Sequence, residues 1–299
     1  LGDYLKSQDD IDERLVGICF AIYFGFFLIK AVQFHNIARF YGLQGSFGEH
    51  ARAYFYGIGL NRLLPYNTGD VAIVKALEGQ GEDKRRAAGV IFVQDKFVIF
   101  EIVFFLLLSL VLTGWGMALR QVFPAFVFFL ILSYLTSRAR AGAAGTQDAA
   151  AGRNHLKAIW QGLANDPAML IKLALISLLA FFLDDITPFI TSQAFTGQYV
   201  HLNVPFLIIQ GGVVAGYIAS RIPVTPAGIG QFEFGFGTAL VMGGIALPEA
   251  ITIALLDGLT RNTTAMILFA VVKIWYGVET NVRSVLLSFN GMASEAAGD

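Results

Sequence analysis

Three long segments of this chain contain no charged side chain, and this feature constrains the fold more than any other. Residues 102–119, 121–137 and 186–220 lack Asp, Glu, Lys and Arg altogether. A helix needs about 18–20 mainly apolar residues to cross the hydrocarbon core of a bilayer. Charged residues make up 14% of the whole sequence, against about 25% in soluble domains. The sequence therefore predicts an all-α polytopic membrane protein with about six to eight transmembrane helices.

Two breaks that contain proline and glycine interrupt the apolar segments, and each begins with an arginine. The first, residues 62–70, reads RLLPYNTGD, and the second, residues 221–233, reads RIPVTPAGIGQFE. Proline removes a backbone donor from a helix, and irregular backbone at membrane depth is tolerated only where it is buried in protein or lines a polar cavity. Paired breaks in the two halves of a membrane protein point to a transport site. We therefore expect one or two re-entrant helices broken at these residues.

A polar segment, residues 138–157, divides the chain near its middle. We predict a single integral membrane domain over residues 1–299. It has two possible halves, 1–137 and 158–299, which this segment joins on the cytoplasmic side. The two breaks fall in different halves and share the order arginine, proline, glycine, acid. This match is too short to establish an internal repeat, and duplication remains an open alternative.

Basic residues indicate the orientation of the chain in the membrane. They gather in residues 84–86 and 138–157, and the positive-inside rule places both loops in the cytoplasm. Residues 47–77 then form a re-entrant hairpin on the cytoplasmic side, with Asn67 or Thr68 as the N-cap of its second helix. A later span begins at Met169 and is expected to end near Pro188, because proline does not continue a helix.

The sequence lacks the motifs that are typical of several classes of function. The phosphate-binding pattern GxxxxGK[ST] is absent, and the four histidines have no metal-ligand spacing, so we expect neither a metal nor another cofactor. A net charge of −1 gives no basis for nucleic-acid binding. Cys19 is expected to be a small core residue. We expect no enzyme, although residues 257–261, DGLTR, are similar to the start of an alcohol phosphotransferase motif.

The first break and the residues after it resemble the transmembrane region of lysylphosphatidylglycerol synthases, within the flippase-like integral membrane superfamily. Residues 64–70, LPYNTGD, are similar to the LPxxxG[DE] pattern of that family. A basic loop at residues 84–86 and the acidic–basic pair Asp95-Lys96 follow, as they do in the family. Asn67-Thr68 stands where a pair like Gly-Arg is commoner, so this chain lacks one cation there.

The second break resembles the same family more closely. Residues 223–233, PVTPAGIGQFE, are similar to Px[ST]PGG[IL]GxxE, with Ala227 in place of a usual glycine. Arg261 matches an arginine in the last helix of the family. The resemblance covers roughly residues 20–275. It implies the binding or translocation of a phospholipid or a polyprenyl-type glycolipid.

The second break also carries the strongest candidate site on chemical grounds. A half-helix that starts there presents free N–H groups and a partial positive charge, which suit a phosphate. Gly228 and Gly230 permit close backbone approach, and Arg221 adds a bidentate phosphate partner. Glu233 either pairs with a cation such as Arg261 or contacts a cationic headgroup. The alternative for the whole segment is a kink that only packs helices.

Charges at membrane depth complete the predicted substrate-binding set. Each isolated charge costs about 2.5–3.5 kcal/mol on insertion scales, so these residues must pair or line a hydrated cavity. Asp257 and Arg261 lie one helical turn apart and can pair with each other, whereas Asp70 is alternatively a helix cap. Asp184 and Asp185 cannot point the same way from one helix. The predicted set is Arg221, Gly228, Gly230, Glu233, Arg62, Asp70, Arg261, Asp257, Asp184 and Asp95.

These features together predict a lipid flippase or a lipid-binding transporter. A polar intramembrane cavity would receive the headgroup of a phospholipid or a glycolipid while the acyl tails stay in the bilayer. Two alternatives remain open at this point: a lipid-binding accessory subunit of a larger membrane complex, and a membrane-embedded lipid-modifying enzyme. We expect a bacterial or archaeal cytoplasmic (inner) membrane, a lipid partner, no nucleic acid, and assembly either as a homo-oligomer or within a larger complex.

Overall fold

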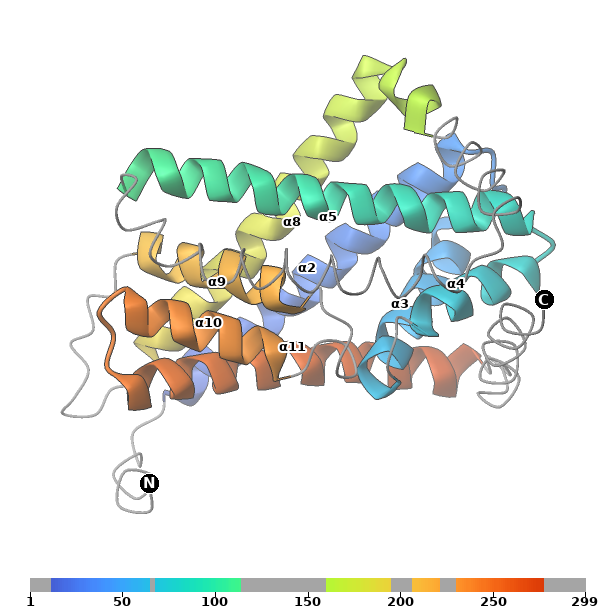
Figure 1. Ribbon diagram of the computed structural model, residues 1–299. Helices are drawn as coiled ribbons and strands as arrows, with labels where there is room; N and C mark the ends of the chain where they lie inside the picture. Colours follow the sequence, from blue (N-terminus) through green and yellow to red (C-terminus); the bar gives the residue numbers. More distant parts are fainter. Residues whose placement is uncertain (1–11, 65–67, 114–159, 195–205, 221–229, 277–299) are drawn as a thin grey trace, which may run out of the picture. The chain divides into compact units, whose positions relative to one another are not determined.

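The computed structural model describes residues 12–64, 68–113, 160–194, 206–220 and 230–276 (Figure 1). Within these residues the regular elements are all α-helices, which confirms the all-α class predicted from the sequence. In chain order they are α2 (Glu13–Phe40), α3 (Phe47–Leu63), α4 (Thr68–Glu78), α5 (Lys84–Thr113), α8 (Pro167–Gln193), α9 (Phe206–Ser220), α10 (Gln231–Met242) and α11 (Leu247–Tyr276).

The chain divides into two compact units, and the boundaries that fall within the described residues lie inside the long helices α2, α5, α8 and α11. Unit 1 comprises Leu1–Phe27, Glu101–Phe129 and Leu179–Thr264, and unit 2 comprises Leu28–Phe100, Leu130–Leu178 and Ala265–Asp299. The polar segment 138–157 and the span expected over residues 121–137 lie outside the described residues. The division of the chain into halves around that segment therefore stays a prediction.

Helix α8 corrects one expectation, because it does not end near Pro188. The helix continues through this proline to Gln193. Proline has no N–H to donate to the carbonyl four residues earlier, here that of Asp184. In membrane helices such a break is tolerated because nearby hydroxyl groups and neighbouring helices satisfy freed polar groups. In α8 the hydroxyl group of Thr187 donates a hydrogen bond to the carbonyl oxygen of Leu183 at 2.9 Å.

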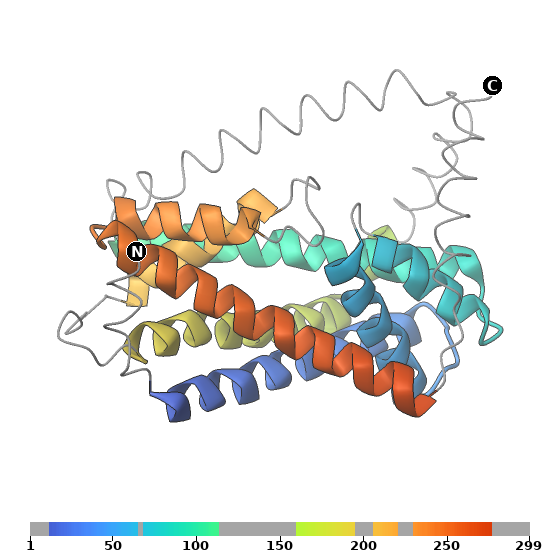
Figure 2. The ribbon, with the colours of Figure 1, turned by 90° about the horizontal axis from the view of Figure 1, so that it is seen from below.

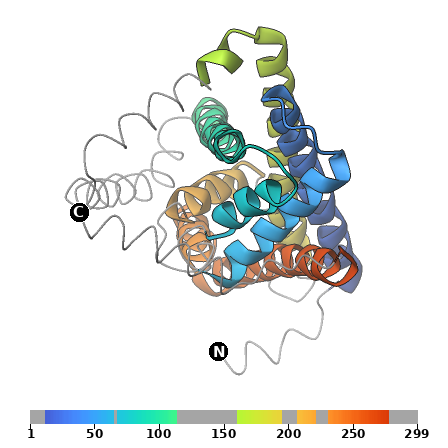
Figure 3. The ribbon, with the colours of Figure 1, turned by 90° about the vertical axis from the view of Figure 1, so that its right-hand side faces the viewer.

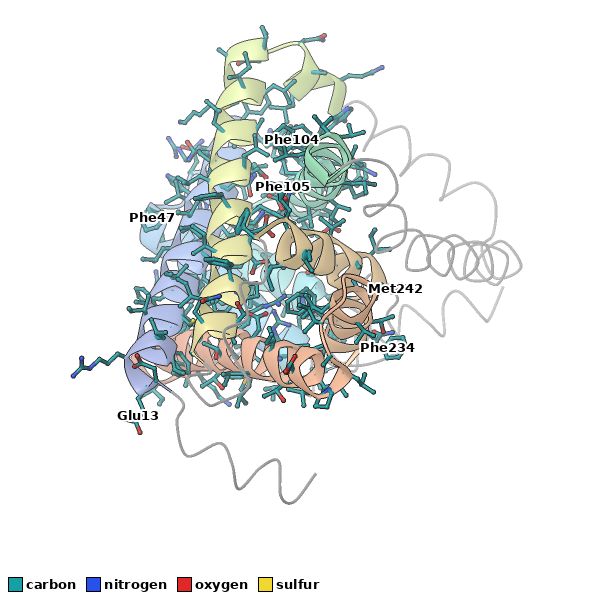
Figure 4. All side chains as sticks on the ribbon, turned by 90° about the vertical axis from the view of Figure 1, so that its left-hand side faces the viewer. Glu13, Phe47, Phe104, Phe105, Phe234 and Met242 are labelled. Carbon is teal, nitrogen blue, oxygen red and sulfur yellow. The ribbon has the colours of Figure 1, made fainter. Side chains whose placement is uncertain are left out.

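Large apolar side chains lie exposed along the helices, as expected for surfaces in contact with lipid. On α8, Ile171, Leu175, Leu179 and Phe182 are between 45 and 62% exposed. On α10, Phe234 and Met242 project outward (Figure 4). By length and composition, two of the described helices are able to cross a membrane: α2, and α11 over residues 247–274. A water-soluble chain rarely exposes apolar residues in contiguous stripes of this kind.

In unit 1, α9 and α10 lie side by side because glycines bring their backbones together (Figures 1 and 2). A Cβ atom at Gly212 would lie 2.6 Å from the ring of Phe236, and one at Gly216 would lie 2.8 Å from the ring of Phe232. Glycine on one helix thus accommodates an aromatic ring of the other. Small residues at the interface are the usual means by which membrane helices approach closely.

In unit 2, α3 and α4 pack against each other on either side of the first break (Figure 3). A Cβ atom at Gly57 would collide with Ile73, and one at Gly69 would collide with the backbone of α3. Asn61 joins the two helices, since its amide oxygen accepts a hydrogen bond from the Gly69 N–H at 2.7 Å and its amide nitrogen donates to Asp70 at 3.2 Å. The helices end and begin on either side of Pro65, as the sequence predicted.

The tight contact between α9 and α10 makes a testable prediction at Gly235. An added methyl group there would lie 2.7 Å from the Cβ atom of Ala219 and 2.8 Å from the carbonyl oxygen of Ala215, and neither atom can rotate away. We expect Gly235→Ala to lower the free energy of unfolding by about 1–3 kcal/mol through overpacking. Thermal unfolding of the purified protein in detergent, followed by circular dichroism, measures the change.

The matched control is Gly17→Ala, because Gly17 also lies inside a helix but has no atom within 4 Å of an added methyl group. This variant should unfold at the temperature of the wild type or slightly above it. Equal unfolding temperatures for Gly235→Ala and Gly17→Ala would show that α9 and α10 do not pack as described.

Candidate functional site

Unit 1 contains a group of charged and hydroxyl-bearing side chains, all buried except the partly exposed Tyr217. We call this group the polar cluster: Tyr23, Asp184, Asp185, Tyr217, Asp257 and Arg261. The exposed fraction is 1% for Asp184, 0% for Asp185 and Asp257, and 6% for Arg261. Four helices supply these residues: α2, α8, α9 and α11. Ionisable residues at membrane depth are rare and usually mark functional sites. The polar cluster is therefore the candidate site of this chain.

Arg261 lies at the centre of the contacts within the polar cluster. Its Nη2 atom donates a hydrogen bond to Asp257 at 2.8 Å, and its Nε atom lies 4.0 Å from an oxygen of Asp184. The guanidinium group also stands over the ring of Phe232, 3.7 Å from the ring centroid. A guanidinium group carries N–H donors around its edge and two flat faces that stack on aromatic rings. The rings of Tyr23 and Tyr217 lie farther away, each 5.7 Å from the guanidinium carbon. Two carboxylates and three aromatic rings thus surround this cation.

Two tyrosine hydroxyl groups bind the carboxylates on their other side. Tyr23 donates a hydrogen bond of 2.6 Å to Asp257, and Tyr217 donates one of 2.7 Å to Asp184. Distances in this range are typical of an O–H donor and a charged acceptor. The result is a continuous chain of polar contacts from α2 through α11 to α8 and α9.

Aromatic rings surround this chain of contacts. Phe105 of α5 stacks on Phe181 at a centroid separation of 4.5 Å, and Phe181 lies 5.2 Å from Tyr217. Tyr217 in turn meets Phe232 edge-on at 5.4 Å. Such surroundings exclude water and strengthen electrostatic interactions.

Several polar atoms of the cluster have hydrogen-bonding capacity that the described residues do not use. They are Oδ1 of Asp184, Nε of Arg261 and both carboxylate oxygens of Asp185. A buried polar group that lacks a partner costs about 1–3 kcal/mol. Native proteins retain few such groups, and each calls for an explanation such as a bound ligand or a catalytic role.

Glu233 sits in the first turn of α10 and has two structural contacts. Its carboxylate accepts a hydrogen bond of 2.6 Å from the N–H of Gly230, whose φ of 82° favours glycine. This contact is the glutamate half of a capping box. The same carboxylate rests against Gly258 of α11, where a Cβ atom would collide with it. Gly258 follows Asp257 directly, so Glu233 is seated beside the polar cluster.

The structure brings some of the predicted site residues together and leaves others unplaced. Asp184, Asp257 and Arg261 meet in the polar cluster, and the predicted pairing of Asp257 with Arg261 is present. Asp184 and Asp185 leave α8 in different directions, yet both are buried. Gly230 and Glu233 belong to the same unit, whereas Arg221 and Gly228 lie outside the described residues.

The remaining predicted residues, Arg62, Asp70 and Asp95, belong to unit 2. Asp70 receives a hydrogen bond from Asn61. Thr68 is the first residue of α4, and its hydroxyl group has no hydrogen-bond partner within the described part of the chain, so it does not act as the side-chain cap. Asn61 of α3 takes over part of that role through the Gly69 N–H. Asp95 is exposed on α5.

Sequence reasoning missed Tyr23, Tyr217 and Phe232 as members or neighbours of the site. Tyrosine and phenylalanine are common in apolar helices, and only tertiary contacts distinguish these three. A usable signal did exist for Asp185, since two consecutive aspartates in an apolar helix are unusual. No group of three or more His, Cys, Asp or Glu suited to a metal ion occurs among the described residues.

The chain is all-α, buries charged residues and exposes apolar helix faces. These features together define a polytopic integral membrane protein. The family described as the lysylphosphatidylglycerol synthase TM region matches residues 2–268, and the chain belongs to that family. The resemblance seen in the two breaks is thereby confirmed. Comparisons with curated proteins and with solved structures gave no match.

The central position of Arg261 predicts a large effect of its removal. Arg261→Met leaves the buried carboxylates of Asp257 and Asp184 without their cation, and breaking a buried ion pair costs about 3–5 kcal/mol. We expect a corresponding loss in the free energy of unfolding, measured by denaturant titration in detergent. Lys273→Met is the control, since this exposed lysine lies on the same helix. A loss of similar size in both variants would contradict the role given to Arg261.

The contact between Glu233 and Gly258 predicts a non-additive pair of substitutions. Gly258→Ala pushes the carboxylate of Glu233 away from α11, and we expect a loss of stability of about 1–3 kcal/mol. In a chain that already carries Glu233→Ala, the same change should be nearly neutral, because the colliding group is absent. A double-mutant cycle on unfolding free energies measures the coupling. Additive effects would rule out the contact.

Proposed function

We propose that this chain is a lipid flippase or lipid-binding transporter that receives the headgroup of a phospholipid or polyprenyl-type glycolipid at a polar intramembrane site. The observation that carries the proposal is the buried polar cluster of unit 1, whose donors and acceptors are only partly used by the described residues. Membership of the lysylphosphatidylglycerol synthase TM region family supports a role with membrane lipids.

The physical argument rests on how a headgroup crosses hydrocarbon. A charged or polar headgroup loses its hydration in the bilayer core, and buried polar groups must replace the lost water contacts. Nε of Arg261 supplies an unused donor, and the carboxylates of Asp184 and Asp185 supply unused acceptors. The exposed apolar faces of the helices suit the acyl tails, which stay in the bilayer. The N–H groups of the first turn of α10 suit the phosphate group, and the carboxylate of Glu233 suits a cationic part of the headgroup.

In this proposal the chain carries the lipid without changing its covalent bonds, and it resides in a bacterial or archaeal cytoplasmic membrane. The contributions of Arg221, Arg62, Asp70 and Asp95 to the lipid path belong to the same proposal. Motion of the lipid would follow alternating access around the site, as in other transporters with broken helices.

The proposal predicts that the charge of Glu233 is needed for lipid movement. Glutamine can also complete a capping box, so Glu233→Gln keeps the start of α10 while it removes the charge. A hydrogen bond to a charged group is worth about 1.5–3 kcal/mol, and we expect the rate of translocation to fall about tenfold or more. The measurement uses proteoliposomes that contain a fluorescent phospholipid, with an impermeant reductant that bleaches the outer leaflet.

The matched control is Glu49→Gln, the same exchange in a second capping box. The Ser46 N–H and hydroxyl group donate to the Glu49 carboxylate at 2.7 and 2.8 Å and lower its pKa below the ordinary value. Glu49→Gln should translocate lipid at the rate of the wild type. Wild-type rates in Glu233→Gln would refute the site. If the chain co-purifies with stoichiometric partner proteins and the isolated chain does not translocate lipid, the chain is an accessory subunit instead.

A further inference from the structure

Asp185 stands apart from every other charged residue of the polar cluster. Its side chain is 0% exposed, and neither carboxylate oxygen accepts a hydrogen bond from the described residues. The preceding residue, Asp184, receives a hydrogen bond from Tyr217 and lies within ion-pair distance of Arg261. Asp184 and Asp185 are thus equally buried, but among the described residues only Asp184 has a hydrogen-bond donor and a nearby cation.

The charges that face Asp185 are of its own sign. Asp184 on α8, Asp257 on α11 and Glu101 on α5 all act on it electrostatically. The buried cation of the described part of unit 1, Arg261, is engaged by Asp257 and Asp184. The other titratable groups around these carboxylates are the hydroxyl groups of Tyr23 and Tyr217 and the thiol of Cys19.

An ionised carboxylate is poorly stable in such a place. Burial without hydrogen-bond donors leaves the negative charge uncompensated, and like charges nearby disfavour it further. A bound proton removes the charge and turns one oxygen into an O–H donor, which suits surroundings rich in carboxylate acceptors. The chemistry of the site therefore matches a proton better than an anion or a neutral ligand.

We propose that Asp185 is a proton-binding site of this chain and that its protonation is linked to lipid movement. The proton comes from bulk water, forms an O–H bond at one carboxylate oxygen, and returns to water when that bond breaks. No other bond changes. The link to lipid movement rests on the function proposed above, whereas proton binding at Asp185 stands on the geometry of unit 1 alone.

The first experiment detects the proton directly and needs no transport. Infrared difference spectra of the purified full-length chain, recorded as the pH is lowered in light and heavy water, report the C=O stretching band of a protonated carboxyl group. We expect this band to be lost in Asp185→Asn and kept in Asp184→Asn. Asp185→Glu should keep a band with a shifted pH midpoint, which separates loss of the proton site from loss of the fold. Glu78→Gln, at an exposed glutamate of α4, should leave the band unchanged.

A buried band that persists in Asp185→Asn would overturn the proposal, as would a band lost only in Asp184→Asn. The absence of any such band, together with saturable binding of ethylammonium that Asp185→Asn abolishes, would assign the site to an organic cation and would also overturn it.

The second experiment tests the link to lipid movement. Proteoliposomes with a fluorescent phospholipid are placed under a pH gradient of either direction. We expect the wild type and Glu49→Gln to change their translocation rate with the gradient, and Asp185→Asn to lose this response. A band at Asp185 without lipid movement in the wild type would refute the proposed function and leave the proton site standing. Lipid movement in the wild type without a band at Asp185 would refute the proton site and leave the proposed function standing.

Discussion

The ion pair between Asp257 and Arg261 is the interaction around which unit 1 is organised. Both residues lie on one face of α11, one turn apart, so the helix itself places their charges together at 2.8 Å. In an apolar interior each charge is strongly unfavourable alone, and their attraction is correspondingly strong. The remaining capacity of both groups must then be met by other helices. Tyr23 of α2, Asp184 of α8 and Phe232 of α10 meet part of it, and Nε of Arg261 keeps unused capacity within the described residues.

The close packing of α9 and α10 also positions an aromatic ring beneath the guanidinium group of Arg261. Phe232 lies against Gly216 on one side, and the guanidinium group of Arg261 stands 3.7 Å from the centre of its ring. A side chain at position 216 would displace the ring and with it the aromatic surface beneath Arg261. Packing and electrostatics in unit 1 are therefore parts of one arrangement, in which small residues position an aromatic ring and the ring positions a charge.

Features that depend on composition or on neighbours along one helix could be predicted from the sequence, whereas contacts between remote helices could not. The helical class, the break around Pro65 and the pairing of Asp257 with Arg261 depend on composition or on neighbours along one helix, so the sequence was sufficient to predict them. The end of α8 was predicted too early because Pro188 is compatible with a membrane helix whose other contacts hold it. The tyrosine partners come from helices remote in sequence, and no local pattern indicates which tyrosine will meet which aspartate.

Pro188 has a mechanical consequence for the polar cluster. The hydrogen bond that it cannot make is the one to the carbonyl of Asp184, so α8 lacks a backbone restraint at the turn that carries Asp184 and Asp185. A helix bends most easily where its hydrogen-bond ladder is interrupted. Bending α8 at this turn changes the distance between Asp184 and Arg261, which is 4.0 Å in the structure. Any change in the curvature of α8 at this turn therefore changes the electrostatic attraction between these two buried charges.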